Sequence, residues 1–241
     1  MLYYNYLNTR SLCSMTRYPY LLLDADNTLF DFDAANRNAF HRVCVRCDIP
    51  DTEENFILYE SCNNAMWAAF DRGECTKEFL VVERFRRFLA KLRLDRDPAL
   101  CNDIHLTSLG QSTLLLPYAE EVCRTLAVNH RLYLVTNAVA SVQKSRLAGS
   151  ALYPYISGAF ISEEAGAGKP STAYFDYVFS HIDGLTKDNC LVVGDSLSSD
   201  IRGANAYGIP CCWYNPKRQP RPDDLRIDYE LADLRELLHI V

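Results

Sequence analysis

The sequence predicts an α/β fold, a doubly wound parallel sheet into which an all-helical domain is inserted. Two observations support this prediction. From about residue 109 onward, short apolar runs typical of buried strands alternate with helical segments, as in repeated β-α units. Between Ala34 and Ser108, in contrast, the apolar residues follow a helical period and no good strand is found.

The overall composition is typical of a soluble globular protein. The 241 residues, 49% of them apolar, suffice for one domain of ordinary size and a smaller insert. A net charge of −6 argues against a nucleic-acid polymer as partner, because such binding needs a basic surface. No apolar run approaches the roughly 20 residues that span a membrane, so we expect no membrane partner. The ten cysteines form no disulfide framework and no zinc-site spacing, which predicts reduced thiols and a cytoplasmic location.

The first strand is predicted at the apolar run Leu21–Leu23, which stops abruptly at Asp24. Residues 1–18 form an extension that we expect to be flexible, and the part before Met15 is expected to be dispensable for stability and activity. The core domain is expected to comprise residues 19–33 and 109–241.

Four helices are predicted in the insert, residues 34–108, where turn signals such as Asp71-Arg72-Gly73 separate them. They are Ala34–Cys47, Thr52–Phe70, Thr76–Leu94 and Pro98–Ser108. Large aromatic side chains are expected to form the core of this small bundle, namely Trp67, Phe70, Phe79, Phe85 and Phe88.

The remaining elements alternate between strand and helix. The predicted strands are Arg131–Val135, Ala159–Ser162, Cys190–Val193 and Ile209–Trp213. The predicted helices are Tyr118–Val128, Val139–Leu147, Ser171–His181 and Leu197–Tyr207. In a parallel sheet the carboxyl ends of the strands face the crevice where open α/β sheets bind ligands.

Two acids, Asp24 and Asp26, follow the first strand at that edge. A buried carboxylate without a partner is very costly, and the natural partners here are a metal ion and a substrate. A calcium-binding EF-hand loop that starts at Asp24 is excluded, because Leu29 and Ala35 stand where Gly and Glu are required.

The segment Asp24–Leu29 resembles the first motif, D-x-D-x-T-[LV], of the haloacid dehalogenase (HAD) superfamily. Three more motifs of that superfamily follow in its order: Thr136-Asn137 after a strand, Lys169 in a loop, and Gly194–Asp200 with the pattern G-D-x-x-x-x-D. Singly, each has a plainer interpretation as a helix cap, a surface lysine or a solvated acid. Four motifs in order are not expected by chance, and the resemblance extends from Tyr20 to the C-terminus.

The resemblance implies a phosphomonoester hydrolase with a Rossmann-like core and a helical cap. Asp24 would attack phosphorus to form an aspartyl-phosphate, and Asp26 would act first as general acid and then as general base. Mg²⁺ would be the cofactor, held by Asp24, the Asp26 backbone carbonyl and Asp195. Because dehalogenases lack a second aspartate like Asp26, dehalogenation is disfavoured.

The phosphoryl group would be bound by Asp24, Thr136, Asn137 and Lys169, with Lys169 also neutralising charge on the nucleophile. Three further residues are expected to orient these residues without binding the phosphoryl group or the metal ion themselves, namely Asp200, Ser196 and Thr28.

The motif details look closest to the pyrimidine 5′-nucleotidase subfamily, to which Ala65-Met66-Trp67 and Cys212–Pro216 are also similar. This implies a nucleoside 5′-monophosphate as the small-molecule substrate. The chain departs from many members at Ala138, where Gly is usual, and at Cys75. Alternatives are a phosphatase for sugar phosphates or phosphoglycolate, a phosphomutase, or a catalytically silent binding protein. The sequence carries no signal on oligomeric state.

Overall fold

Six parallel strands form the central sheet, in the spatial order β3-β2-β1-β4-β5-β6. The computed structural model describes residues 16–241; the expectations for the first 15 residues lie outside this range. The strands are β1 (Tyr20–Leu23), β2 (Arg131–Thr136), β3 (Ile156–Ile161), β4 (Cys190–Gly194), β5 (Cys211–Tyr214) and β6 (Tyr229–Leu231). This order is that of doubly wound nucleotide-binding folds, and it confirms the predicted fold class.

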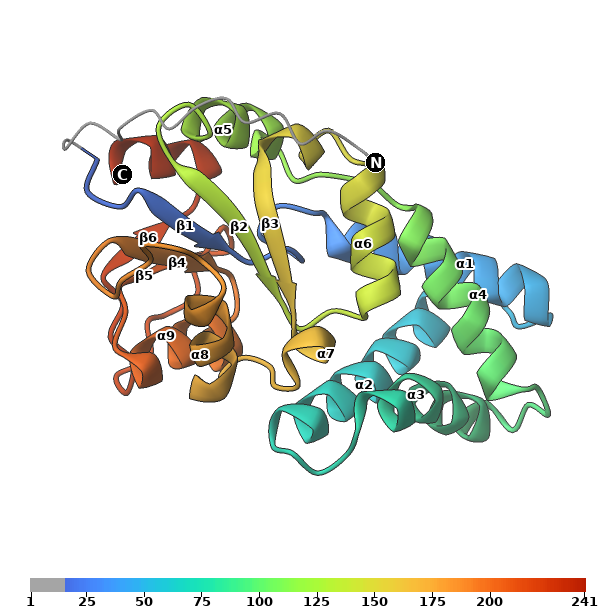
Figure 1. Ribbon diagram of the computed structural model, residues 1–241. Coiled ribbons are helices and arrows are strands. Elements are labelled where there is room, and N and C mark those ends of the chain that lie inside the picture. Colours follow the sequence, from blue (N-terminus) through green and yellow to red (C-terminus); the bar gives the residue numbers. More distant parts are fainter. Residues whose placement is uncertain (1–15) are drawn as a thin grey trace, which may run out of the picture.

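Helices cover both faces of the sheet, which is why β1 and β4 are apolar and buried along their whole length (Figure 1). Alternate side chains of β1 point to opposite faces. Leu21 and Leu23 belong to a core shared with α5 (Ala119–Leu126) and η3 (Leu234–His239). Tyr20 and Leu22 face α8 (Thr172–Ser180) and α9 (Arg202–Tyr207).

The cap consists of the first four of the five helices that lie between β1 and β2 in the chain: α1 (Phe32–Cys47), α2 (Glu53–Asp71), α3 (Lys77–Leu92) and α4 (Pro98–Gln111). They lie together beyond the carboxyl end of the sheet (Figure 1). The side chains of Thr52 and Thr76 cap α2 and α3 by accepting backbone hydrogen bonds. Within the described residues, no helix is long and apolar enough to cross a membrane.

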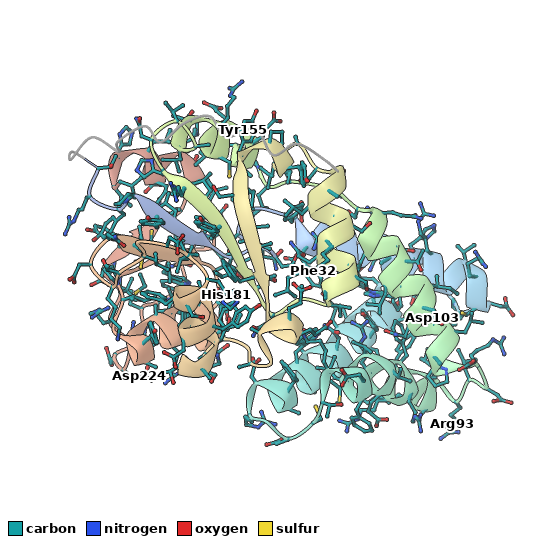
Figure 2. The ribbon with its side chains drawn as sticks, viewed as in Figure 1. Phe32, Arg93, Asp103, Tyr155, His181 and Asp224 are labelled. Carbon is teal, nitrogen blue, oxygen red and sulfur yellow. The ribbon has the colours of Figure 1, made fainter. Side chains whose placement is uncertain are left out.

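The core of the cap is aromatic, as predicted, although its members differ in part. Phe85 and Phe88 are buried among Phe40, Phe56 and Tyr59. The expectation for Phe79 was wrong, because 52% of its surface is exposed. Trp67 and Phe70 are half-buried and belong to a separate cluster with Met66, Leu80 and Val81. Figure 2 labels Phe32, the first residue of α1, and Tyr155, which directly precedes β3 at the other end of the sheet.

Several boundaries differ from the prediction. β5 starts at Cys211, after Pro210, because proline has no N–H to donate to a ladder. The predicted helix Leu197–Tyr207 divides into a π-helical turn, η2 (Leu197–Ile201), and α9. β3 begins at Ile156, three residues before its predicted start, and follows the short turn η1 (Tyr153–Tyr155).

Two packing details concern the predicted N-terminal extension and the cysteines. Tyr18, at the end of the predicted extension, is buried and its hydroxyl lies 3.1 Å from that of Tyr229 in β6. Nine cysteines of the described chain carry free thiols, and Cys44 and Cys47 belong to the apolar core of the cap.

Candidate active site

Asp24 lies immediately after β1, at the carboxyl edge of the sheet. Its backbone N–H donates to Val193 O of β4 at 2.8 Å, so the strand pairing itself fixes its position. Its carboxylate is buried and accepts from Lys169 Nζ at 2.6 Å and from Thr28 Oγ1 at 3.2 Å. The first motif therefore delivers a carboxylate that is held from two sides.

Lys169 is buried and donates each of its three ammonium protons. The acceptors are Asp24 Oδ1, Asp200 Oδ1 and Val135 O, each 2.6 Å away. Burial alone would lower the pKa of Lys169, but the carboxylates of Asp200 and Asp24 outweigh burial and raise that pKa above its usual value. Lys169 is thus a permanent positive charge beside Asp24.

The Asn137 side chain holds the loop that carries Lys169. Its Oδ1 accepts from Lys169 N at 2.9 Å, and its Nδ2 donates to Lys169 O at 2.7 Å. A Cβ on Gly168 would lie 2.7 Å from Asn137 Oδ1, so only glycine permits this approach. The Asn137 side chain, which we expected to bind the phosphoryl group, thus forms hydrogen bonds with the backbone of Lys169.

Three carboxylates meet at this point, from Asp24, Asp195 and Asp200, with one oxygen of each within 4.8 Å of the others. Burial raises the pKa of Asp195 to about 8, and the charges of Asp24 and Asp200 add to this effect. Burial and the Asp24 carboxylate also raise the pKa of Asp200, to about 7, against the lowering effect of Lys169. Crowded carboxylates with raised pKa values favour a bound cation, and oxygen donors suit Mg²⁺.

Asp200 is the most enclosed of the three acids, because it is fully buried whereas Asp24 is 7% exposed and Asp195 is half-buried. Asp200 Oδ1 accepts from Lys169 and its Oδ2 accepts from the backbone N–H of Ser196 at 3.1 Å. A Cβ on Gly194 would lie 2.3 Å from Asp200 Cγ, so the glycine makes room for this carboxylate. Asp24 and Asp195 therefore remain as the side chains best suited to hold a metal ion.

Two of the other predicted residues, Thr136 and Ser196, line the cleft between core and cap, whereas Thr28 is fully buried beside Asp24 and Asp195. Thr136 ends β2, is buried, and accepts from Ala138 N at 3.1 Å, which leaves its hydroxyl proton for an acceptor in the cleft. Thr28 Oγ1 accepts from Asp195 N at 3.1 Å and so links the first and fourth motifs. The Ser196 side chain caps η2 by accepting from Ser199 N at 3.3 Å.

Asp26 has a partner that was not predicted. Its carboxylate is an ion pair with Nη1 of Arg146, a fully buried side chain of α6 (Ala140–Gly149). The Asp26 side chain is 26% exposed, and burial raises its pKa although Arg146 opposes this. Arg146 is one of two basic residues in α6 and lies 120 positions from Asp26 in the sequence.

The cleft lies between the core and the cap and has a volume of about 260 Å³. Its core side carries the residues described above. The cap contributes the polar or amphipathic residues Asn63, Asn64, Trp67 and Arg84, and six apolar residues also line the cleft, namely Phe32, Val81, Leu106, Leu109, Val139 and Val142. Core and cap therefore both contribute polar groups to a cleft that has many apolar lining residues.

Arg84 is buried in the cap and has neutral partners. It donates to Asn63 Oδ1 at 2.9 Å, to Asn102 Oδ1 at 3.1 Å and to Val81 O at 3.1 Å, and His105 Nδ1 lies 3.3 Å away. Burial and the adjacent guanidinium lower the pKa of His105 well below 6.5, so its ring is neutral. The cap end of the cleft thus carries a positive charge without a carboxylate partner among the described residues.

Comparison with known proteins identifies several that are similar over almost the whole chain. The family model for haloacid dehalogenase-like hydrolases matches residues 18–208. YfnB of Bacillus subtilis, assigned to the HAD hydrolases, is 35% identical over 94% of this chain and 97% of its own. Its crystal structure bound to magnesium has a TM-score of 0.89 and covers 93% of this chain and 99% of that chain.

Two further relatives are pyrimidine 5′-nucleotidases. PynA of Streptococcus pneumoniae is 32% identical over 92% of this chain and 94% of its own. YjjG of Escherichia coli is 27% identical over 92% and 96%, respectively.

Proposed function

This chain belongs to the haloacid dehalogenase-like hydrolase family, and on that premise we propose that it is a magnesium-dependent phosphomonoesterase with Asp24 as nucleophile. The observation that carries the proposal is the arrangement around Asp24. One of its oxygens faces the charged Lys169, and Asp195 lies close enough to share a cation with it. Phosphate monoesters are anionic, so their hydrolysis depends on positioning and on charge neutralisation.

The chemistry needs two displacements at phosphorus. An Asp24 oxygen attacks phosphorus, the ester bond breaks, and Asp26 gives its proton to the departing alcohol oxygen. Water then attacks the same phosphorus, Asp26 takes its proton, and inorganic phosphate leaves as the Asp24 carboxylate is restored. Lys169 and Thr136 stabilise the negative charge on the phosphoryl oxygens in both steps. Asp24, Asp195 and the Asp26 backbone carbonyl would hold Mg²⁺, whose charge neutralises the phosphoryl group when bound.

The substrate is proposed to be a nucleoside 5′-monophosphate, with pyrimidine nucleotides foremost. Support comes from PynA and YjjG, which share 32% and 27% identity with almost the whole chain. The cleft is compatible with this class, because Trp67, Asn63 and Arg84 of the cap line it together with several apolar side chains. An apolar wall with a few polar groups is typical of small-molecule sites.

A phosphate-release screen with and without Mg²⁺ tests both levels of this proposal. It compares nucleoside monophosphates with sugar phosphates and phosphoglycolate. Higher kcat/KM for a nucleotide than for every other ester is expected. If a sugar phosphate or phosphoglycolate is preferred, the nucleotidase assignment is wrong and the phosphatase class survives. Absence of any Mg²⁺-dependent release would contradict both.

The cap variant Trp67→Ala tests the selectivity of the cleft. It should lower kcat/KM for nucleotides more than for a simple aryl phosphate, because only the nucleoside reaches the cap wall. Phe70→Ala is a matched control, since Phe70 packs edge-on against Trp67 but does not line the cleft. Equal losses for both esters in Trp67→Ala would show that Trp67 is only a packing residue.

A further inference from the structure

Arg146 connects three segments that meet beside the catalytic acids. Its Nη1 pairs with the Asp26 carboxylate and also lies 3.4 Å from Gln143 Oε1. Its Nε donates to Ser112 O at 3.2 Å, and its guanidinium lies 4.6 Å from the centre of the Phe30 ring. Because the side chain is fully buried, few other positions are open to it.

Ser112 and Phe30 belong to the two linker segments that join the cap to the core. These linkers run side by side: Asp31 N donates to Leu114 O at 3.0 Å, and Leu116 N donates to Leu29 O at 2.9 Å. Arg146 therefore holds Asp26 with one nitrogen and the linker that leaves the cap with another. The Arg146 guanidinium thus connects the Asp26 carboxylate to the linkers between the cap and the core.

Two buried N–H groups next to this pair have no acceptor among the described residues, Arg146 Nη2 and Gln143 Nε2. Both side chains come from α6, and Arg146 lines the cleft. Buried donors without partners favour a negatively charged or acceptor group nearby. The Asp26 carboxylate, which accepts from Arg146 Nη1, is the anionic partner that Arg146 has in this corner.

We propose that Arg146 is the positioning residue for Asp26, holding its carboxyl group where it meets the oxygen of the departing alcohol. The inference rests on the proposed function, in which Asp26 gives that oxygen a proton. Asp26 follows Asp24 in a loop and is partly exposed, so its backbone alone does not fix the carboxyl group. The residue acts through Asp26 and does not itself touch the phosphoryl group.

The test compares two esters in one variant. An alkyl phosphate has a poor leaving group that needs the proton from Asp26, whereas dinitrophenolate departs without one. In Arg146→Met, kcat/KM for the alkyl phosphate should fall roughly a hundredfold and that for dinitrophenyl phosphate less than about fivefold. The ratio between the esters does not depend on the fraction of folded enzyme, so a destabilised variant still gives an answer.

Two further variants make the assignment specific. Arg146→Lys should recover part of the alkyl-phosphate activity, because it keeps a positive charge at the end of a similar stem. Adding Arg146→Met to Asp26→Asn should cause little further loss, since both changes remove the same contribution. Lys144→Met, which removes an exposed charge from the same helix, should leave the ratio of the two esters unchanged.

Equal losses of kcat/KM for the two esters in Arg146→Met, or losses that multiply in the double variant, would show that Arg146 only stabilises the linkers between cap and core. If Arg146→Met does not fold, the same ratio is measured on Arg146→Lys, where it should move in the same direction by a smaller factor. If the parent releases phosphate from neither ester, the proposed function itself fails. A parent that hydrolyses both, with an unchanged ratio in the variants, overturns only the role of Arg146.

Discussion

Replacing Lys77 with Met should weaken the contact between the cap and the core. Lys77 is the first residue of α3, and its buried ammonium donates to Asn137 O at 2.7 Å, Ala138 O at 3.1 Å and Ser162 Oγ at 2.8 Å. Glu163 Oε1 lies 3.2 Å away as its counter-charge. A single cap side chain therefore binds the loop that follows Thr136.

The size of the effect follows from these contacts. A hydrogen bond from a charged donor contributes about 1.5–3 kcal/mol, but burial disfavours the ammonium, and burial indeed lowers the pKa of Lys77. Methionine fills the space of the stem, and water can reach acceptors near Glu163, whose side chain is 33% exposed. We therefore expect the free energy of unfolding to fall by about 2–3 kcal/mol, a sum well below three full hydrogen bonds.

Thermal unfolding measures this loss. For a chain of this size, 1 kcal/mol corresponds to roughly 2–4 °C, so the Tm of Lys77→Met should fall by roughly 4–12 °C. Lys91→Met is the matched control, because Lys91 is exposed near the other end of α3, and its Tm should change by less than about 2 °C. Equal Tm values for the two variants would refute the idea that Lys77 stabilises the cap on the core.

Two further perturbations have a defined direction. His105 is buried with its pKa well below 6.5, so below about pH 6.5 the unfolded chain binds a proton that the folded chain does not. The parent should therefore lose up to about 1.4 kcal/mol of stability per pH unit as the pH falls. The Tm of His105→Gln should decline less steeply with falling pH than that of the parent. Parallel Tm curves for the two proteins would contradict this role of His105. Gly194→Ala would place a Cβ 2.3 Å from Asp200 Cγ and displace that carboxylate from Lys169, so kcat should fall by at least about a hundredfold. Gly110→Ala, where the nearest atoms lie 3.7 Å from the added Cβ, should keep full activity, and equal activity of both alanine variants would disprove the role of Gly194.

The sequence was sufficient to place the acids of the site, because the signals are local. Asp24 and Asp195 each follow a run of apolar residues, and parallel strands bring such positions to one edge of a sheet. The resemblance of the four motifs then put Thr136 and Lys169 in the same region, and the structure places both beside Asp24 at the cleft.

Arg146, Lys77 and Arg84 could not be predicted, since each lies in a helix that carries other basic residues, and no pattern distinguishes it from a solvated one. Their importance comes from contacts with residues far along the chain, such as the 120 positions between Asp26 and Arg146. The contact of the Asn137 side chain with the Lys169 backbone was not predicted for the same reason, because the two residues are 32 positions apart. The three-residue strand β6 is too short for periodicity to reveal.

Covalent phosphorylation of Asp24 is the most direct test of the proposed chemistry. The enzyme is mixed with Mg²⁺ and a nucleoside monophosphate that carries a radioactive phosphoryl group, quenched in acid during turnover, digested and analysed by mass spectrometry. Label should appear on the peptide that contains Asp24, should be released by hydroxylamine as expected of an acyl phosphate, and should be absent from Asp24→Asn. Steady release of phosphate by Asp24→Asn at the rate of the parent, or label on a peptide without Asp24, would contradict the assignment of the nucleophile.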